Sequence, residues 1–190
     1  MNEQNFRRAE LSELEQVIDV YEKTIQRMHK LQLFQWDEEY PNAAVLKADI
    51  EQQQLYINKR GNKIASCYVR NQESDQQYEN GAWKNPKASY CVIHRFCVNP
   101  EFQNQGIGNE TMEQIEQQMI AEGIEAIRLD TFTENSYAVK LYEKRGYLKV
   151  GMANWQKGSF YLMEKYLIKE KQGGTYQGEH EKANERRTEE

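Results

Sequence analysis

The chain has 190 residues, of which 25 are basic and 30 are acidic, for a formal net charge of −5 at pH 7. This length suits one domain with a sizeable core, and the interleaved charges show no basic patch of the kind that binds nucleic acid. No stretch approaches the roughly 18 consecutive apolar residues of a membrane span, and the first residues lack the apolar run of a signal peptide. The sequence therefore predicts a soluble, cytoplasmic protein that binds neither nucleic acid nor a membrane.

The three cysteines, Cys67, Cys91 and Cys97, form an odd set whose spacing matches no metal motif. Cys91 and Cys97 fall in one predicted strand, roughly 20 Å apart, whereas a disulfide needs Cα atoms within about 7 Å. We expect three buried thiols in a reducing compartment. A pairing between Cys67 and one of the others across a sheet is the alternative.

The first half of the chain predicts two helices followed by a hairpin. Ser12 is expected to open the first helix, with Glu15 completing a capping box, and apolar residues then recur at helical spacing up to Met28. In chain order the expected elements are a short strand over residues 6–9, the first helix, a second helix over 43–53, a strand over 54–58, a turn over 59–62 and a strand over 63–69.

The second half predicts four strands and two helices. A polar loop over residues 70–88 leads into a convincing strand over 89–98. The first helix of this half places Met112, Ile115 and Met119 on one face. Asn135 or Ser136 caps the second helix, which runs to Arg145 before Gly146. The other expected strands cover residues 126–131, 147–152 and 159–167.

From residue 169 onward the chain has almost no apolar residue, which predicts a disordered tail. The remaining pattern mixes strands, helices and a hairpin. It indicates an α/β or α+β domain with a mixed sheet.

Two glycines, Gly106 and Gly108, stand between a predicted strand and a predicted helix. The first N–H groups of a helix lack internal partners and carry the positive end of the helix dipole, and glycine lets backbone approach a phosphate closely. Asn109 and Glu110 replace the Lys and Ser/Thr of a P-loop, and Thr111 occupies the third small position of a dinucleotide fingerprint. The loop by itself indicates either an anion site or a turn that only starts a helix.

The residues around this loop carry a family resemblance. The sequence QNQGIG over residues 103–108 resembles the pyrophosphate loop of the GNAT superfamily of acetyl-CoA-dependent N-acetyltransferases. FCVNP over residues 96–100 is similar to the end of the family's fourth strand. RLDT over 128–131, Asn135 and AVKLYEKRGY over 138–147 are similar to its second signature. The match covers about residues 90–152, and the first half of the chain fits only in the order of its elements.

The resemblance implies a fold, a reaction and a co-substrate. The expected fold is α/β (α+β), with a mixed, mostly antiparallel central sheet flanked by helices, over residues 1–168, followed by the tail over 169–190. The expected enzyme is an acyltransferase that moves acetyl from acetyl-CoA, without a metal, to a small-molecule primary amine by direct attack in a ternary complex. A protein N-terminus or lysine is the alternative acceptor, and a catalytically silent CoA-binding module is the alternative outside enzymes. A homodimer is compatible with the sequence.

The resemblance also assigns residues to acetyl-CoA. The phosphates are expected on backbone N–H groups of the glycine loop, and the pantetheine arm is expected to pair like an extra strand beside residues 126–131. Asn135 matches an asparagine near the pantetheine, although it is also suited to be a plain helix cap. The full set of expected co-substrate residues is Phe96, Cys97, Val98, Gln103, Asn104, Gln105, Gly106, Ile107, Gly108, Asn109, Asn135 and Tyr142.

Two residues are expected to move protons. Tyr142 occupies the position of the family's general-acid tyrosine and is expected to protonate the leaving CoA thiolate. His94 lies four residues before Val98, on the same predicted strand face, and is expected to deprotonate the attacking amine. The alternatives are a tyrosine that only packs its helix on the sheet and a histidine that only packs or binds a backbone group.

The acceptor site is expected from two segments. Trp36 and Tyr40 follow the first helix, together with the acidic residues 37–39, and Trp83 lies in the polar loop with Tyr78 and Tyr90 nearby in sequence. Aromatic rings with carboxylates suit a small cationic amine. The alternative is a solvated acidic turn with packed aromatic residues.

Overall fold

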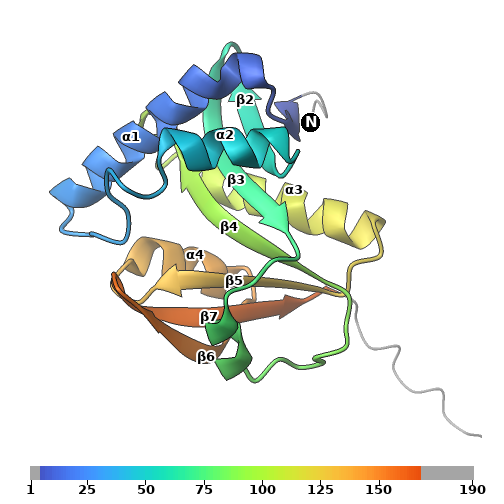
Figure 1. Cartoon of the computed structure of the whole chain (residues 1–190). Helices are drawn as coiled ribbons and strands as arrows, with labels where there is room; N and C mark the ends of the chain where they lie inside the picture. The colour runs from blue at the N-terminus through green and yellow to red at the C-terminus, as the bar shows by residue number, and fades with distance from the viewer. Residues whose placement is uncertain (1–4, 168–190) are drawn as a thin grey trace, which may run out of the picture.

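The computed structural model describes residues 5–167, so the predicted tail over 169–190 lies outside the described residues. Seven strands form one sheet in the order β1-β2-β3-β4-β5-β7-β6 (Figure 1). Every neighbouring pair is antiparallel except β4 and β5, which confirms the mixed, mostly antiparallel sheet. The strands are β1 (Phe6–Arg8), β2 (Leu55–Arg60), β3 (Lys63–Asn71), β4 (Tyr90–Val98), β5 (Ala126–Phe132), β6 (Leu148–Trp155) and β7 (Gly158–Tyr166).

Helices cover both faces of the sheet. α1 and α2 lie on one face and α3 and α4 on the other (Figure 1). Successive strand residues point to opposite faces, so Ile57 and Val69 pack in the α1 layer while Tyr56 and Tyr68 pack in the α3 layer. The helices are α1 (Leu14–Lys30), α2 (Ala43–Glu51), α3 (Ile107–Ala121) and α4 (Ser136–Lys144), with short 3₁₀ helices η2 (Leu11–Glu13), η3 (Gln76–Asn80) and η4 (Pro100–Phe102).

The predicted start of the first helix is wrong. The capping box is formed by Glu10 and Glu13, not by Ser12 and Glu15, because a 3₁₀ turn precedes α1 and the Glu13 carboxylate accepts the Glu10 N–H at 3.1 Å. Glu13 is buried and also accepts hydrogen bonds from the Arg7 guanidinium, which lower its pKa to about 2. Lys59, 46 residues away, also donates to Glu13 at 3.0 Å, so the carboxylate that caps this turn has partners both near and far in the chain.

A β-bulge interrupts β4 at Arg95. Cys97 pairs with Cys67 and His94 pairs with Val69, so two residues of β4 stand opposite one residue of β3. Arg95 has a φ of +51°, and its carbonyl accepts the hydroxyl of buried Tyr21 at 2.7 Å. The extra residue reverses the alternation, so His94 shares a face with Cys97, and the prediction that it shares a face with Val98 is wrong.

The same bulge opens the sheet. β4 pairs with β5 only from Tyr90 to Ile93, although β4 continues to Val98 and β5 continues to Phe132. Among the described residues no strand pairs with the edge of β4 that faces β5 beyond Ile93. The two parallel strands therefore leave a gap in the middle of the sheet.

All three cysteines are free and buried, as expected. Cys67 and Cys97 lie directly opposite each other on β3 and β4, while Cys91 belongs to the core layer on the other face. Within residues 5–167 no helix is long and apolar enough to cross a membrane.

Candidate active site

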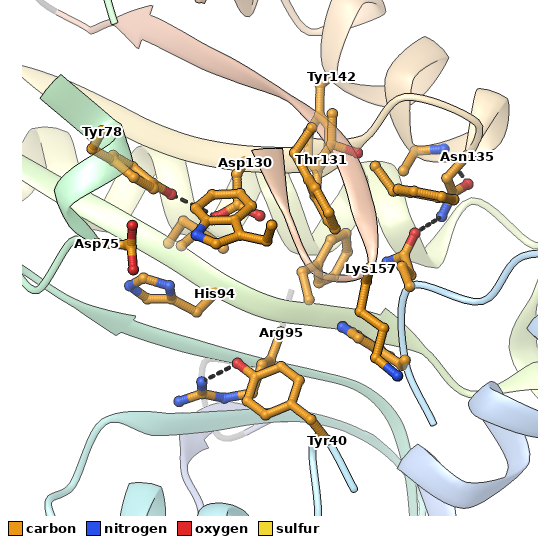
Figure 2. Close-up of a pocket in the computed structure, with 18 residues that line it drawn as sticks. Tyr40, Asp75, Tyr78, His94, Arg95, Asp130, Thr131, Asn135, Tyr142 and Lys157 are labelled. Atoms are coloured by element: carbon orange, nitrogen blue, oxygen red, sulfur yellow. Dashed lines mark hydrogen bonds between the residues drawn. The ribbon is translucent and has the colours of Figure 1, made fainter. Parts of the chain in front are cut away.

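A cavity of about 370 Å³ lies where β4 and β5 separate. β4 contributes His94, Arg95 and Phe96, and β5 contributes Asp130 and Thr131 (Figure 2). The β3–β4 segment (Asp75 and Tyr78), the α1–α2 segment, α4 with the residue before it, and the β6–β7 hairpin supply the remaining walls. Their lining residues include Gln35, Trp36, Tyr40, Asn135, Ala138, Tyr142, Trp155, Lys157 and Phe160. Residues far apart in the chain thus converge on the gap in the sheet.

The glycine loop forms the N-terminus of α3, as the sequence predicts. Gly106 precedes the helix with a φ of +80°, a left-handed conformation that favours glycine. Ile107, Gly108 and Asn109 form the first turn, whose N–H groups have no intrahelical partner. The side chain of Gln103 donates to the Val98 carbonyl at 3.2 Å, so it ties the loop to the end of β4.

His94 lines the cavity, and its surroundings settle which ring nitrogen carries the proton. Its Nε2 lies 2.9 Å from Asn71 Oδ1 and 3.2 Å from the Glu73 carbonyl. The Asn71 amide is oriented by the Glu73 N–H, which donates to the same Oδ1 at 3.0 Å. Both partners accept, so Nε2 donates and Nδ1 is the basic nitrogen. Burial, with Arg95 as the second cause, lowers the pKa of His94 to about 4, so the ring is neutral at pH 7.

Tyr142 points from α4 into the same cavity. It is buried, and its ring packs 5.7 Å from that of Tyr147. Burial, followed by the negative charge of Asp130, raises its pKa. The phenol is therefore protonated at neutral pH and available as a donor.

Asp130 is the residue that the sequence reasoning missed. It lies on β5 and lines the cavity, where its Oδ1 accepts the Tyr78 hydroxyl at 2.7 Å (Figure 2). Burial raises its pKa, while the Tyr78 hydrogen bond acts in the opposite direction. A lone aspartate inside the buried-looking RLDT strand was the available signal.

Only some of the residues predicted to bind the acceptor line the cavity. Trp36 and Tyr40 line the cavity, and the Tyr40 hydroxyl accepts from Arg95 at 2.7 Å. Glu38 and Glu39 are exposed and do not line the cavity. Asp37 forms an ion pair with Lys157 of the β6–β7 turn.

Trp83 does not line this cavity. It lines a neighbouring cavity of about 270 Å³ together with Tyr90 and Arg128. Asp75 and Tyr78 line both cavities. Trp83 stacks on Tyr78 with ring centres 5.7 Å apart, so Tyr78 stands between Trp83 and Asp130 in this chain of contacts.

Asn135 caps α4 as expected, and it also lines the cavity. Its Oδ1 accepts the Ala138 N–H at 3.1 Å, which caps α4, and its Nδ2 donates to Gln35 at 3.2 Å at the edge of the cavity. Cys97 and Val98 do not line the cavity, but their backbone lies on the unpaired edge of β4. No three His, Cys, Asp or Glu side chains among residues 5–167 are grouped to hold a metal ion.

Comparison with known proteins places this architecture. The model of the acetyltransferase (GNAT) family matches residues 13–147. Comparison with curated protein sequences found no match. A provisionally assigned acetyltransferase from Staphylococcus aureus Mu50 is 26% identical, with a TM-score of 0.68 over 86% of this chain and 99% of its own.

Two further solved structures share the fold. A GNAT-family acetyltransferase from Streptococcus agalactiae 2603 has a TM-score of 0.77 at 19% identity, over 86% of this chain and 95% of its own. The PaiA N-acetyltransferase of Thermoplasma acidophilum, solved in complex with coenzyme A, has a TM-score of 0.64 at 19% identity, over 85% of this chain and 97% of its own.

Proposed function

Because the chain belongs to the acetyltransferase (GNAT) family and is an acyltransferase that uses acetyl-CoA, we propose that it acetylates a primary amine of a small molecule by direct attack in a ternary complex. The observation that carries this proposal is the cavity at the gap between β4 and β5, which brings a neutral histidine, a protonated tyrosine and the carboxylates of Asp75 and Asp130 together. Acetyl-CoA supplies the activated acetyl group.

The residues at the gap fit acetyl-CoA. The unpaired edge of β4 from Phe96 to Val98 offers backbone hydrogen bonds to the amides of a pantetheine arm. The first turn of α3 offers N–H groups and the positive end of the helix dipole to a pyrophosphate. Asn135 and Tyr142 stand at the cavity end of this track, near the place where the thioester would lie.

The walls of the cavity favour a small acceptor. The α1–α2 segment is tied to the β6–β7 turn by the Asp37–Lys157 ion pair and to the start of α4 by the Gln35–Asn135 hydrogen bond. An extended peptide needs an open groove, whereas these ties enclose the space beside Trp36 and Tyr40. The carboxylates of Asp75 and Asp130 suit the positive charge of an amine.

We assign the proton transfers to three side chains. Asp130 takes the proton that the amine must lose to attack, and the new bond joins the amine nitrogen to the acetyl carbon as the carbon–sulfur bond breaks. Tyr142 donates its hydroxyl proton to the leaving sulfur, and the phenolate that remains recovers a proton from the acylated nitrogen, which loses its second hydrogen as the neutral amide forms. Neutral His94, whose Nδ1 is an acceptor, holds a hydrogen of the amine and orients its lone pair. A backbone N–H near Val98 donates a hydrogen bond to the thioester oxygen and stabilises the negative charge that develops there.

A turnover assay with thiol detection tests the function. We expect release of free CoA thiol with one or more small amines from a panel of diamines, polyamines, aminoglycosides and amino acids. Peptides with free N-termini or lysines serve as the comparison set. Turnover with peptides alone would overturn the small-molecule assignment, and the absence of turnover despite tight acetyl-CoA binding would indicate a CoA-binding module.

The replacement Gly106→Val should weaken acetyl-CoA binding at least about tenfold, because a β-branched residue in the left-handed conformation costs roughly 1–2 kcal/mol and displaces the loop from the phosphates. Calorimetry on the folded variant measures this. Gly61→Val is the matched control, since Gly61 also has a positive φ, +62°, but lies in the β2–β3 turn. Equal acetyl-CoA affinity in both variants would mean that the Gly106 loop is only a turn.

The replacement His94→Gln should lower kcat/KM for the amine by about tenfold, the size of one lost hydrogen bond. The acidic limb of the pH profile should stay, because Asp130 remains. The variant should also lose a pH dependence of stability. In the folded protein His94 stays neutral down to about pH 4, whereas in the unfolded chain it takes up a proton below about pH 6.5. The stability of the wild type therefore decreases as the pH is lowered from 6.5 to about 4.

Melting temperatures measured between pH 6.5 and about 4 check the predicted decrease in stability, which should be smaller in His94→Gln than in the wild type. If the acidic limb of the rate profile disappears in this variant while Asp130→Asn keeps it, His94 is the proton acceptor and the assignment to Asp130 is wrong.

A further inference from the structure

The chain between β3 and β4 is built into the sheet by specific contacts. The Ala82 N–H donates to the Val150 carbonyl at 2.8 Å, and the Gln77 side chain bonds both the N–H and the carbonyl of Asn154 on β6. A Cβ at Gly81 would collide with the Trp83 ring, so this position has no room for a side chain. This segment, residues 72–89, therefore covers the outer edge of β6 in one defined position.

A buried ion pair anchors the middle of that segment. Arg128 on β5 and Glu164 on β7 stand directly opposite in the sheet, 5% and 4% exposed, and are joined at 3.1 Å. Glu164 accepts the Lys84 N–H at 2.8 Å, and Arg128 donates to the Asn85 carbonyl at 3.2 Å. Both charged side chains thus hydrogen-bond to the backbone of residues 84–85. These bonds account for a buried ion pair beside a loop.

The guanidinium of Arg128 also makes cation–π contacts with two aromatic rings. It lies 4.5 Å from the ring centre of Trp83 and 4.1 Å from that of Tyr90. Trp83 in turn stacks on Tyr78 at 5.7 Å and donates its indole N–H to the Tyr78 carbonyl at 2.9 Å. Tyr90 has no such bond to Tyr78 among the described residues. Trp83 is therefore the ring that both lies on Arg128 and hydrogen-bonds to Tyr78.

The contacts that begin at Arg128 end at Asp130 in the cavity. The Tyr78 hydroxyl donates to Asp130 at 2.7 Å, and Asp130 lies two residues after Arg128 on the same face of β5. Arg128, Trp83, Tyr78 and Asp130 thus form a loop of contacts that begins and ends on one strand. Figure 2 shows Tyr78 reaching Asp130 from the edge of the cavity.

We infer that the Arg128–Glu164 pair, acting through Trp83 and Tyr78, positions the Asp130 carboxylate in the cavity, so that these four are positioning residues for the acceptor side of the reaction. The inference rests on the proposed function only for what Asp130 does; the holding of its carboxylate is a property of the free protein. It also gives Trp83 a role other than contact with the acceptor.

The test is an NMR titration of the Asp130 side-chain carboxyl in the free, full-length protein. The Tyr78 hydrogen bond stabilises the ionised carboxylate, so its loss raises the pKa of Asp130. We expect a clear rise in Tyr78→Phe, a smaller rise in Trp83→Leu, and no change in Tyr90→Leu. Tyr90→Leu is the matched control because it removes the other ring that stacks on Arg128.

Kinetics with an accepted amine give the second readout. The acidic limb of kcat/KM should move to higher pH in Tyr78→Phe and Trp83→Leu, with up to about a tenfold loss near neutral pH in Tyr78→Phe, and acetyl-CoA affinity should not change. An unshifted carboxyl titration in Trp83→Leu, or an equal shift in Tyr90→Leu, would overturn the inference. A shifted titration with turnover that is indifferent to Asp130→Asn would instead overturn the assignment of Asp130 as proton acceptor and leave the positioning intact, whereas the absence of turnover with every amine would overturn the proposed function.

Discussion

Replacing Tyr142 with phenylalanine should lower turnover by about 10²–10⁴-fold, the usual range for a lost general acid. The ring stays in the α4 layer, where it packs against Tyr147, and only the hydroxyl in the cavity is lost. Burial and the charge of Asp130 raise the pKa of this phenol, so the proton that it donates is present across the neutral range. Steady-state turnover with thiol detection measures the loss, and calorimetry should show little change in acetyl-CoA affinity.

Tyr147→Phe is the control for this prediction. It makes the same substitution in the neighbouring ring, whose buried hydroxyl has no hydrogen-bond partner within the described residues. Removing an unsatisfied buried hydroxyl should not destabilise the fold, and turnover should remain near wild type. Near-wild-type turnover in Tyr142→Phe as well would make Tyr142 a packing residue and would leave the leaving thiolate without an assigned donor.

Replacing Asp130 with asparagine should also lower kcat/KM for the amine by about 10²–10⁴-fold, because the side chain keeps its size but no longer takes a proton. The acidic limb of the pH profile should vanish with it. Asp75→Asn is the matched control, since Asp75 is a second carboxylate of the same cavity and asparagine preserves its cap on the Gln77 N–H. An equal loss in both variants would indicate that the negative charge of the cavity matters and that proton transfer to Asp130 does not.

The same variant should not be less stable. The pKa of Asp130 is raised in the folded protein, so the folded state holds this proton more tightly than the unfolded chain, and ionisation at pH 7 costs stability. Asparagine still accepts the Tyr78 hydroxyl without that cost. The melting temperature of Asp130→Asn at pH 7 should therefore equal or exceed that of the wild type, and a large fall would mean that lost activity reflects unfolding.

Local features of this protein follow from neighbouring residues and were predictable. Gly106 precedes α3 in a left-handed conformation that glycine adopts without strain, and Asn135 caps α4 with its own side chain. The short apolar runs of β4 and β5 indicate buried strands because both faces of these strands are covered. The sequence by itself therefore determined the elements, the glycine loop and the family resemblance.

Contacts between distant residues needed the folded chain. The carbonyl at the Arg95 bulge accepts the hydroxyl of Tyr21, 74 residues away, and the bulge reverses which side of β4 His94 occupies. Tyr78 meets Asp130 across 52 residues, and Asp37 meets Lys157 across 120. The first pair forms only once β5 lies beside the segment between β3 and β4, and the second only once the β6–β7 turn reaches the α1–α2 segment. Only the folded chain shows which carboxylates line the cavity, because burial and partner geometry, not residue type, set their positions and the pKa of Asp130.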